Sequence, residues 1–130
     1  MSRKTAFRRA LMSWWPAAFV MAAIFVLSSQ PSDALPLLGW ADALVKKGGH
    51  VLGYAALAVA YWRGLDWKPR QLRIAWLLAF IYGITDELHQ VVVAGRHASA
   101  WDVFLFDAPG AALGLWLAYG VLRRTPRAYR

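Results

Sequence analysis

Hydrophobic positions along the chain are gathered into four stretches, and short polar segments separate them. With a few flanking residues, each stretch reaches the roughly 20 residues that a transmembrane helix needs. The pattern therefore predicts an all-α integral membrane bundle of four transmembrane helices, forming a single domain over residues 1–130. The expected spans are residues 11–29, 43–62, 72–90 and 102–122.

Charged residues divide unequally between the gaps. Most of the 15 lysines and arginines precede the first stretch, lie between the second and the third, or follow the fourth, whereas most of the 7 acids lie in or beside the other two gaps. Short segments rich in Lys and Arg stay in the cytoplasm during membrane insertion. We therefore expect both termini to be cytoplasmic and the acidic segments to lie on the outer side of the membrane.

The composition also favours a membrane protein. The chain is 59% hydrophobic and 17% charged, whereas a soluble domain is nearer to half apolar and a quarter charged. Its net charge of +8 is split between the flanks of apolar stretches, so the expected partners are anionic lipid headgroups and not nucleic acid. There is no cysteine, which excludes disulfides and thiolate metal sites.

Parts of the predicted bundle depart from plain apolar helices. Gly48 and Gly49 lie just before the clean apolar part of the second span, which predicts a break there and a re-entrant or kinked entry. Residues 91–101 are partly apolar and partly charged, and we expect a short helix in the membrane interface. In the fourth span, Gly110 and Gly114 have a spacing that lets helices approach closely, within the chain or between subunits of an oligomer.

The outer halves of the spans carry polar side chains at helical spacing, so that the members of each group share one helix face. Charged groups that face lipid are costly. We therefore expect these side chains to face one another across the bundle, with the carboxylates paired to Lys47 and Arg96. The candidate site residues are Lys47, His50, Tyr54, Asp86, Glu87, Gln90, Arg96, Ser99, Asp102 and Asp107.

Structural roles are the alternatives for these residues. Snorkelling to the interface explains Lys47, and packing explains Tyr54. A hydrogen bond to a backbone carbonyl accounts for His50, helix capping for Ser99, and a structural ion pair for Arg96. No metal-ligand spacing such as H-E-x-x-H occurs in the chain, so neither a metal nor another cofactor is expected.

The same polar groups, in this order, resemble the VanZ-like family of bacterial membrane proteins. The residues that carry the resemblance are Ser28 to Pro31, Lys47-x-x-His50-x-x-x-Tyr54, Asp86-Glu87-x-x-Gln90, Arg96-x-x-Ser99-x-x-Asp102 and Gly110-x-x-x-Gly114. The family commonly has Asn at the position of Asp107. The resemblance implies a multi-pass protein of the bacterial cytoplasmic membrane, in a family whose namesake is associated with resistance to the glycopeptide teicoplanin. The partners it implies are membrane lipids, a lipid-linked cell-wall precursor or a glycopeptide.

Four roles are open at this point. The first is binding of an anionic envelope lipid or lipid-linked precursor, held by Lys47, His50 and Arg96. The second is a membrane-embedded hydrolase or transferase for a lipid phosphate or acyl group, with His50 as acid or base beside Asp86 and Glu87. The third is a small transporter or proton relay along the intramembrane acids. The fourth is a purely structural or assembly role.

Overall fold

The structure is a computed structural model that describes residues 3–30, 40–96 and 98–124, with side chains from residue 45 onward in the second of these segments. The described part is helical and contains no strand, which confirms the all-α prediction. The elements are α1 (Arg3–Ser28), α2 (Trp40–Gly64), η2 (Pro69–Gln71), α3 (Leu72–Gln90), α4 (Ala100–Asp102), η3 (Val103–Asp107) and α5 (Ala108–Arg124).

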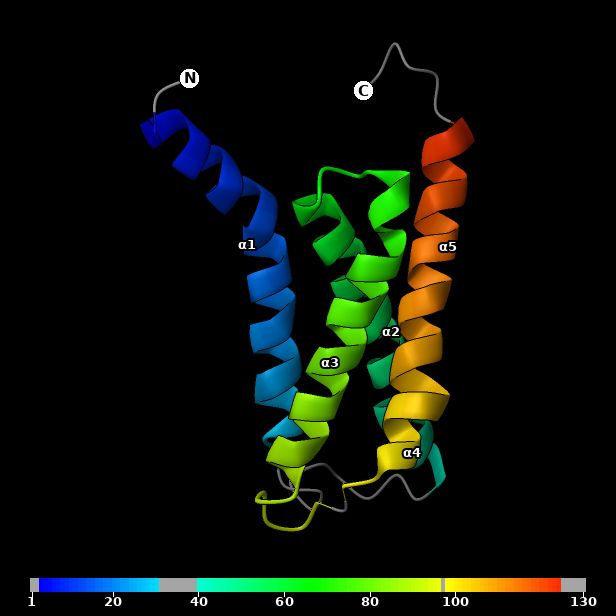
Figure 1. The fold of residues 1–130 in the computed structure, drawn as a ribbon. Helices are drawn as coiled ribbons and strands as arrows, with labels where there is room; N and C mark the ends of the chain where they lie inside the picture. Colours follow the sequence, from blue (N-terminus) through cyan, green and yellow to red (C-terminus); the bar gives the residue numbers. More distant parts are fainter. Residues whose placement is uncertain (1–2, 31–39, 97, 125–130) are drawn as a thin grey trace.

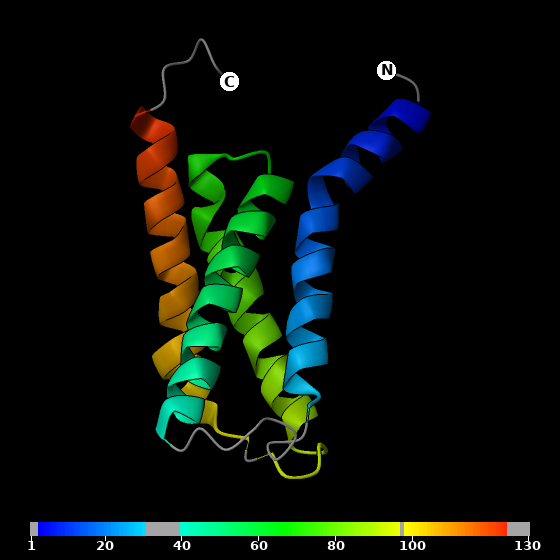
Figure 2. The same ribbon diagram turned by 180° about the vertical axis from the view of Figure 1, so that it is seen from behind.

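The long helices run alternately up and down (Figures 1 and 2). α1 begins and α5 ends at one end of the bundle, which we call the terminal end. α1 and α3 end, and α4 begins, at the other end, which we call the α4 end. α2 packs against α1, α3 and α5, whereas α1 has few contacts with α3. α1 is therefore held in the bundle mainly by α2.

The long helices correspond to the expected spans, and one predicted irregularity is wrong. α3 coincides with the expected span 72–90, but α1 begins at Arg3 because the basic segment continues the helix beyond its apolar part. α2 runs without interruption through Gly48 and Gly49, so the predicted break is wrong. A helical glycine costs about 1 kcal/mol relative to alanine, which is less than the several kcal/mol of each unpaired backbone group in lipid.

The segment between α3 and α4 consists of turns, and the predicted interfacial helix is absent from its described residues. The backbone N–H of Val93 donates to the carbonyl of Gln90, and that of Arg96 donates to the carbonyl of Val93, each at 3.2 Å. Gly95 has a φ of 72°, a left-handed conformation that glycine adopts without steric cost. These turns lead the chain back to the bundle and bring Arg96 to the end of α1.

α4, η3 and α5 form one continuous helix, and η3 is its π-helical turn. The N–H of Ala108 donates to the carbonyl of Val103, five residues earlier. Pro109 follows, and proline both lacks an N–H and crowds the preceding turn. A π-turn is one of the features that accommodate such a disruption. Asp107 lies at the end of this wider turn and is buried, with 1% exposure.

Glycines bring α5 into close contact with α2. A Cβ added to Gly110 would lie 2.6 Å from the carbonyl oxygen of Val51, and one added to Gly114 would lie 2.6 Å from that of Ala55. Only glycine permits this approach of the two helices. The predicted contact face of α5 is therefore packed, at Gly110 and Gly114, against α2 of the same chain.

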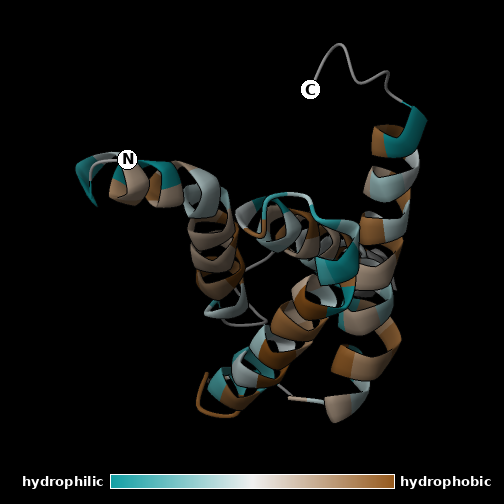
Figure 3. Cartoon of the chain, turned by 45° about the horizontal axis from the view of Figure 1, so that its top comes forward, coloured by the Kyte–Doolittle hydropathy of each residue, from teal (hydrophilic) through white to brown (hydrophobic). Residues whose placement is uncertain are grey.

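The outer surface of the bundle is apolar. α1 and the continuous helix Ala100–Arg124 are long and apolar enough to span a membrane, and large side chains such as Phe19 and Trp116 are exposed. Figure 3 shows hydrophobic colours along the helices and hydrophilic colours at the terminal end. Soluble proteins rarely expose extensive apolar surface, so these features indicate a membrane protein.

Candidate functional site

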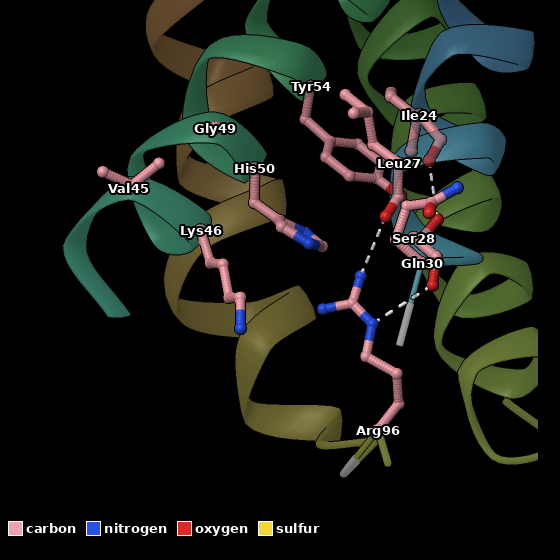
Figure 4. Close-up of a pocket in the computed structure, with 10 residues that line it drawn as sticks. All are labelled: Ile24, Leu27, Ser28, Gln30, Val45, Lys46, Gly49, His50, Tyr54 and Arg96. Atoms are coloured by element: carbon pink, nitrogen blue, oxygen red, sulfur yellow. Dashed lines mark hydrogen bonds between the residues drawn. The ribbon is translucent and has the colours of Figure 1, made fainter. Parts of the chain in front are cut away.

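A pocket of about 270 Å³ lies between α1 and α2 at the α4 end (Figure 4). It is lined by Ile24, Leu27 and Ser28 at the end of α1, by Gln30 just after it, by Val45, Lys46, Gly49, His50 and Tyr54 of α2, and by Arg96 from the turns before α4. Leu27 and Val45 are largely exposed. The pocket therefore opens to the outside of the bundle between these two helices.

The lining of the pocket is mostly hydrocarbon, with nitrogen-bearing groups concentrated in one part. Lys46 and His50 are four residues apart and therefore lie on the same stripe of α2. Figure 4 shows the His50 ring and the Arg96 guanidinium group directed into the space between α1 and α2, and the Lys46 side chain extending beside them toward the α4 end. An apolar recess beside cationic groups matches the two parts of an amphiphile with a negative headgroup.

Arg96 is held by the end of α1. Its Nε donates to the carbonyl of Ser28 at 3.1 Å, and its Nη2 donates to the carbonyl of Leu27 at 3.3 Å. The last carbonyls of a helix lack partners within the helix and carry its negative partial charge. Among the described residues, Arg96 has no carboxylate partner, so the predicted pairing of Arg96 with Asp86 or Glu87 is wrong.

Asp86 joins three helices beneath the pocket. Its carboxylate, 3% exposed, accepts hydrogen bonds from Ser28 Oγ at 2.5 Å, from Gln90 Nε2 at 3.2 Å and from the Tyr54 hydroxyl at 3.4 Å. A buried carboxylate is tolerated when its oxygens are hydrogen-bonded. Asp86 therefore does face the other helices as predicted, although its partners are neutral side chains and one of them, Gln90, lies on its own helix.

His50 and Asp107 form a second, partly buried contact, between α2 and the π-turn. The distance from His50 Nδ1 to Asp107 Oδ1 is 3.0 Å. Within the described residues, the other oxygen, Oδ2, has no hydrogen-bond partner. Gly83 of α3 packs beside this oxygen, since a Cβ added to it would lie 3.4 Å from Oδ2 and also 3.4 Å from the ring of Tyr54.

Three of the predicted site residues lie around the start of α4 and do not line the pocket: Glu87, Ser99 and Asp102. The backbone N–H of Ser99 donates to Glu87 Oε2 at 2.7 Å. Ser99 occupies the N-cap position of α4, as the capping alternative predicts, but its hydroxyl makes no capping hydrogen bond. The carboxylate of Glu87 thus fixes the chain where it re-enters the bundle.

The two neighbouring lysines of α2 differ in position. Lys47, the predicted site residue, is exposed, and its Nζ lies 4.6 Å from the centroid of the Phe106 ring. This is a cation–π contact, and it replaces the predicted pairing with a carboxylate. Lys46 lines the pocket instead. In the sequence, the four-residue spacing between Lys46 and His50 indicates a shared helix face as well as the three-residue spacing of Lys47 does.

The described residues contain no group of three or more His, Asp or Glu side chains that could hold a metal ion. Several side chains at the pocket can take part in binding or proton transfer. These supply two cationic groups, an imidazole with a buried carboxylate behind it, and an apolar wall.

The profile of the VanZ/LLP1 family matches residues 2–123, nearly the whole chain. Comparison with curated proteins found no match, and comparison with solved structures found none either. The family match confirms the resemblance carried by the sequence motifs.

Proposed function

The chain belongs to the VanZ/LLP1 family, and from that premise we propose that it binds an anionic, phosphate-bearing lipid of the cell envelope. In this proposal the protein crosses the bacterial cytoplasmic membrane four times, with both termini in the cytoplasm. The pocket between α1 and α2 then lies near the extracytoplasmic surface and takes a lipid from the outer leaflet.

The distribution of basic residues supports this topology. The described basic side chains at the terminal end are Arg3, Lys4, Arg8, Arg9, Arg63, Lys68, Arg70, Arg73, Arg123 and Arg124. Segments rich in Lys and Arg beside membrane helices stay cytoplasmic. Because the helices alternate in direction, the α4 end and its pocket would face the opposite side.

The observation that carries the proposal is the presence of two cationic side chains, Lys46 and Arg96, at one part of an otherwise apolar pocket. Charge-assisted hydrogen bonds from a guanidinium or an ammonium group are the usual means of holding a phosphate. The exposed hydrocarbon of Leu27 and Val45 continues the pocket outward, where acyl or prenyl chains would lie. A volume of about 270 Å³ is below the range of drug-sized sites, which favours a lipid headgroup over a glycopeptide.

Lys46→Gln should weaken binding of phosphatidate by about tenfold, because it removes one charge-assisted hydrogen bond from the headgroup. The affinity is measured by native mass spectrometry of the full chain in neutral detergent, with phosphatidylcholine as the zwitterionic comparison. Lys47→Gln is the matched control, since it removes the same charge one residue further along, outside the pocket.

The expected result is a selective loss in the Lys46 variant, with the Lys47 variant and the wild type alike. Equal losses of phosphatidate affinity in both variants would show that the net charge of the protein, and not the pocket, determines binding. Unchanged affinity in both, or equal affinity for phosphatidate and phosphatidylcholine, would contradict the pocket as an anionic lipid site.

A further inference from the structure

Lipid binding alone does not require the hydrogen bond between His50 and Asp107. Asp107 does not touch the pocket, and its contact with the pocket is made through the imidazole of His50. The His50 side chain is 20% exposed and that of Asp107 is 0% exposed. The pair therefore consists of a buried carboxylate and an imidazole that reaches the pocket surface.

This geometry fixes how the imidazole is presented. Because Nδ1 lies 3.0 Å from Asp107 Oδ1, the proton of the neutral ring is held on Nδ1 and donated to the carboxylate. Nε2 then carries the free lone pair, and no described residue forms a hydrogen bond with it. The same arrangement orients histidine bases in hydrolases, where a buried carboxylate sets the tautomer and stabilises the imidazolium that forms.

The ring is also fixed in position from its other side. Its centroid lies 6.1 Å from that of Tyr54, with an interplanar angle of 21°, and Tyr54 is itself fully buried. A base held in place by packing and by one hydrogen bond is preorganised for proton transfer. The neighbouring Lys46 and Arg96 are placed to stabilise negative charge that develops on a phosphoryl group.

Building on the proposed function, we propose that the pocket hydrolyses the terminal phosphate of the lipid it binds, a lipid phosphate monoester or diphosphate. His50 Nε2 takes a proton from water, and the water oxygen forms a bond to phosphorus. The P–O bond to the lipid, or to the inner phosphate, breaks, and the leaving oxygen takes up the proton from the imidazolium. Inorganic phosphate and a lipid alcohol or monophosphate are the products. Asp107 is a positioning residue in this scheme.

The experiment measures release of inorganic phosphate by the purified full chain in detergent, with phosphatidate and a polyprenyl diphosphate as probes. His50→Gln is expected to lower kcat by about 100-fold or more, the range found for a general base, and to leave binding of the probe within a few fold of the wild type. His89→Gln is the matched control. His89 lies at the same end but outside the pocket, bonded to Ser29 Oγ at 3.0 Å, and its variant should retain full turnover.

Two variants of Asp107 distinguish a positioning role of its carboxylate from a general structural role. Asp107→Asn keeps an acceptor for the Nδ1 proton and should lose less kcat than Asp107→Ala, with KM unchanged in both variants. Wild-type protein that binds the probes but releases no phosphate would overturn hydrolysis and leave lipid binding intact. Turnover by His50→Gln equal to that of the wild type would also overturn it. Protein that neither binds nor cleaves the probes would remove both proposals.

Discussion

Replacing Tyr54 with alanine is expected to lower the free energy of unfolding by about 3–5 kcal/mol, the range for removing a large buried aromatic side chain. Tyr54 has 0% exposure and lies between the His50 ring and the Asp86 carboxylate. Its loss would leave a cavity between α2 and α3 and remove the support of the imidazole. Unfolding of the detergent-solubilised protein, followed by circular dichroism, measures the change.

Tyr54→Phe is the matched variant, because it keeps the ring and removes only the hydroxyl. The hydrogen bond from that hydroxyl to Asp86 is long, at 3.4 Å, and interhelical hydrogen bonds in membrane proteins average about 0.6 kcal/mol. We therefore expect the phenylalanine variant to remain within about 1 kcal/mol of the wild type. A loss in Tyr54→Phe as large as that in Tyr54→Ala would contradict packing as the main role of this residue.

Arg96→Ala is expected to weaken phosphatidate binding by between about tenfold and 100-fold, because a guanidinium makes up to two charge-assisted hydrogen bonds to one headgroup. The same change removes two hydrogen bonds from the end of α1, so α1 should also separate from α2 more easily. Native mass spectrometry measures the affinity, and proteolysis within α1 measures its detachment.

Arg70→Ala provides the comparison for Arg96→Ala. Arg70 is an exposed arginine in η2 at the terminal end, far along the helices from the pocket, and its variant should bind phosphatidate as the wild type does. Wild-type affinity in Arg96→Ala, with the protein folded, would exclude Arg96 from the headgroup site.

Sequence reasoning was most successful where charge and hydropathy decide the structure. The bounds of α3 coincide with the expected span 72–90, and the grouping of His50, Asp86 and Asp107 follows from the cost of turning such side chains toward lipid. Helical spacing placed His50 and Tyr54 on one face, and their rings are stacked in the structure.

The partners of these residues could not be predicted, because helical spacing does not fix how helices rotate against each other. Lys46 and Lys47 lie four and three residues before His50, so both share its face of α2. Only the packing of α1 on α2 decides which of them lines the pocket. Ile24 and Leu27 look like lipid-facing residues of a plain span. The partners of Arg96 are backbone carbonyls, which no pattern of side chains reveals.

The central claim is that the pocket faces the outside of the cell. Thiol labelling of intact cells with a membrane-impermeant reagent tests this claim most directly. The chain has no cysteine, so single substitutions report without background. Ala94 lies in the exposed turns beside Arg96, and Lys68 lies in the exposed segment before η2 at the terminal end. The two variants are Ala94→Cys and Lys68→Cys. Labelling of Ala94→Cys in intact cells, and of Lys68→Cys only after the cells are opened, is the predicted result. The reverse pattern would place the pocket in the cytoplasm and contradict the account.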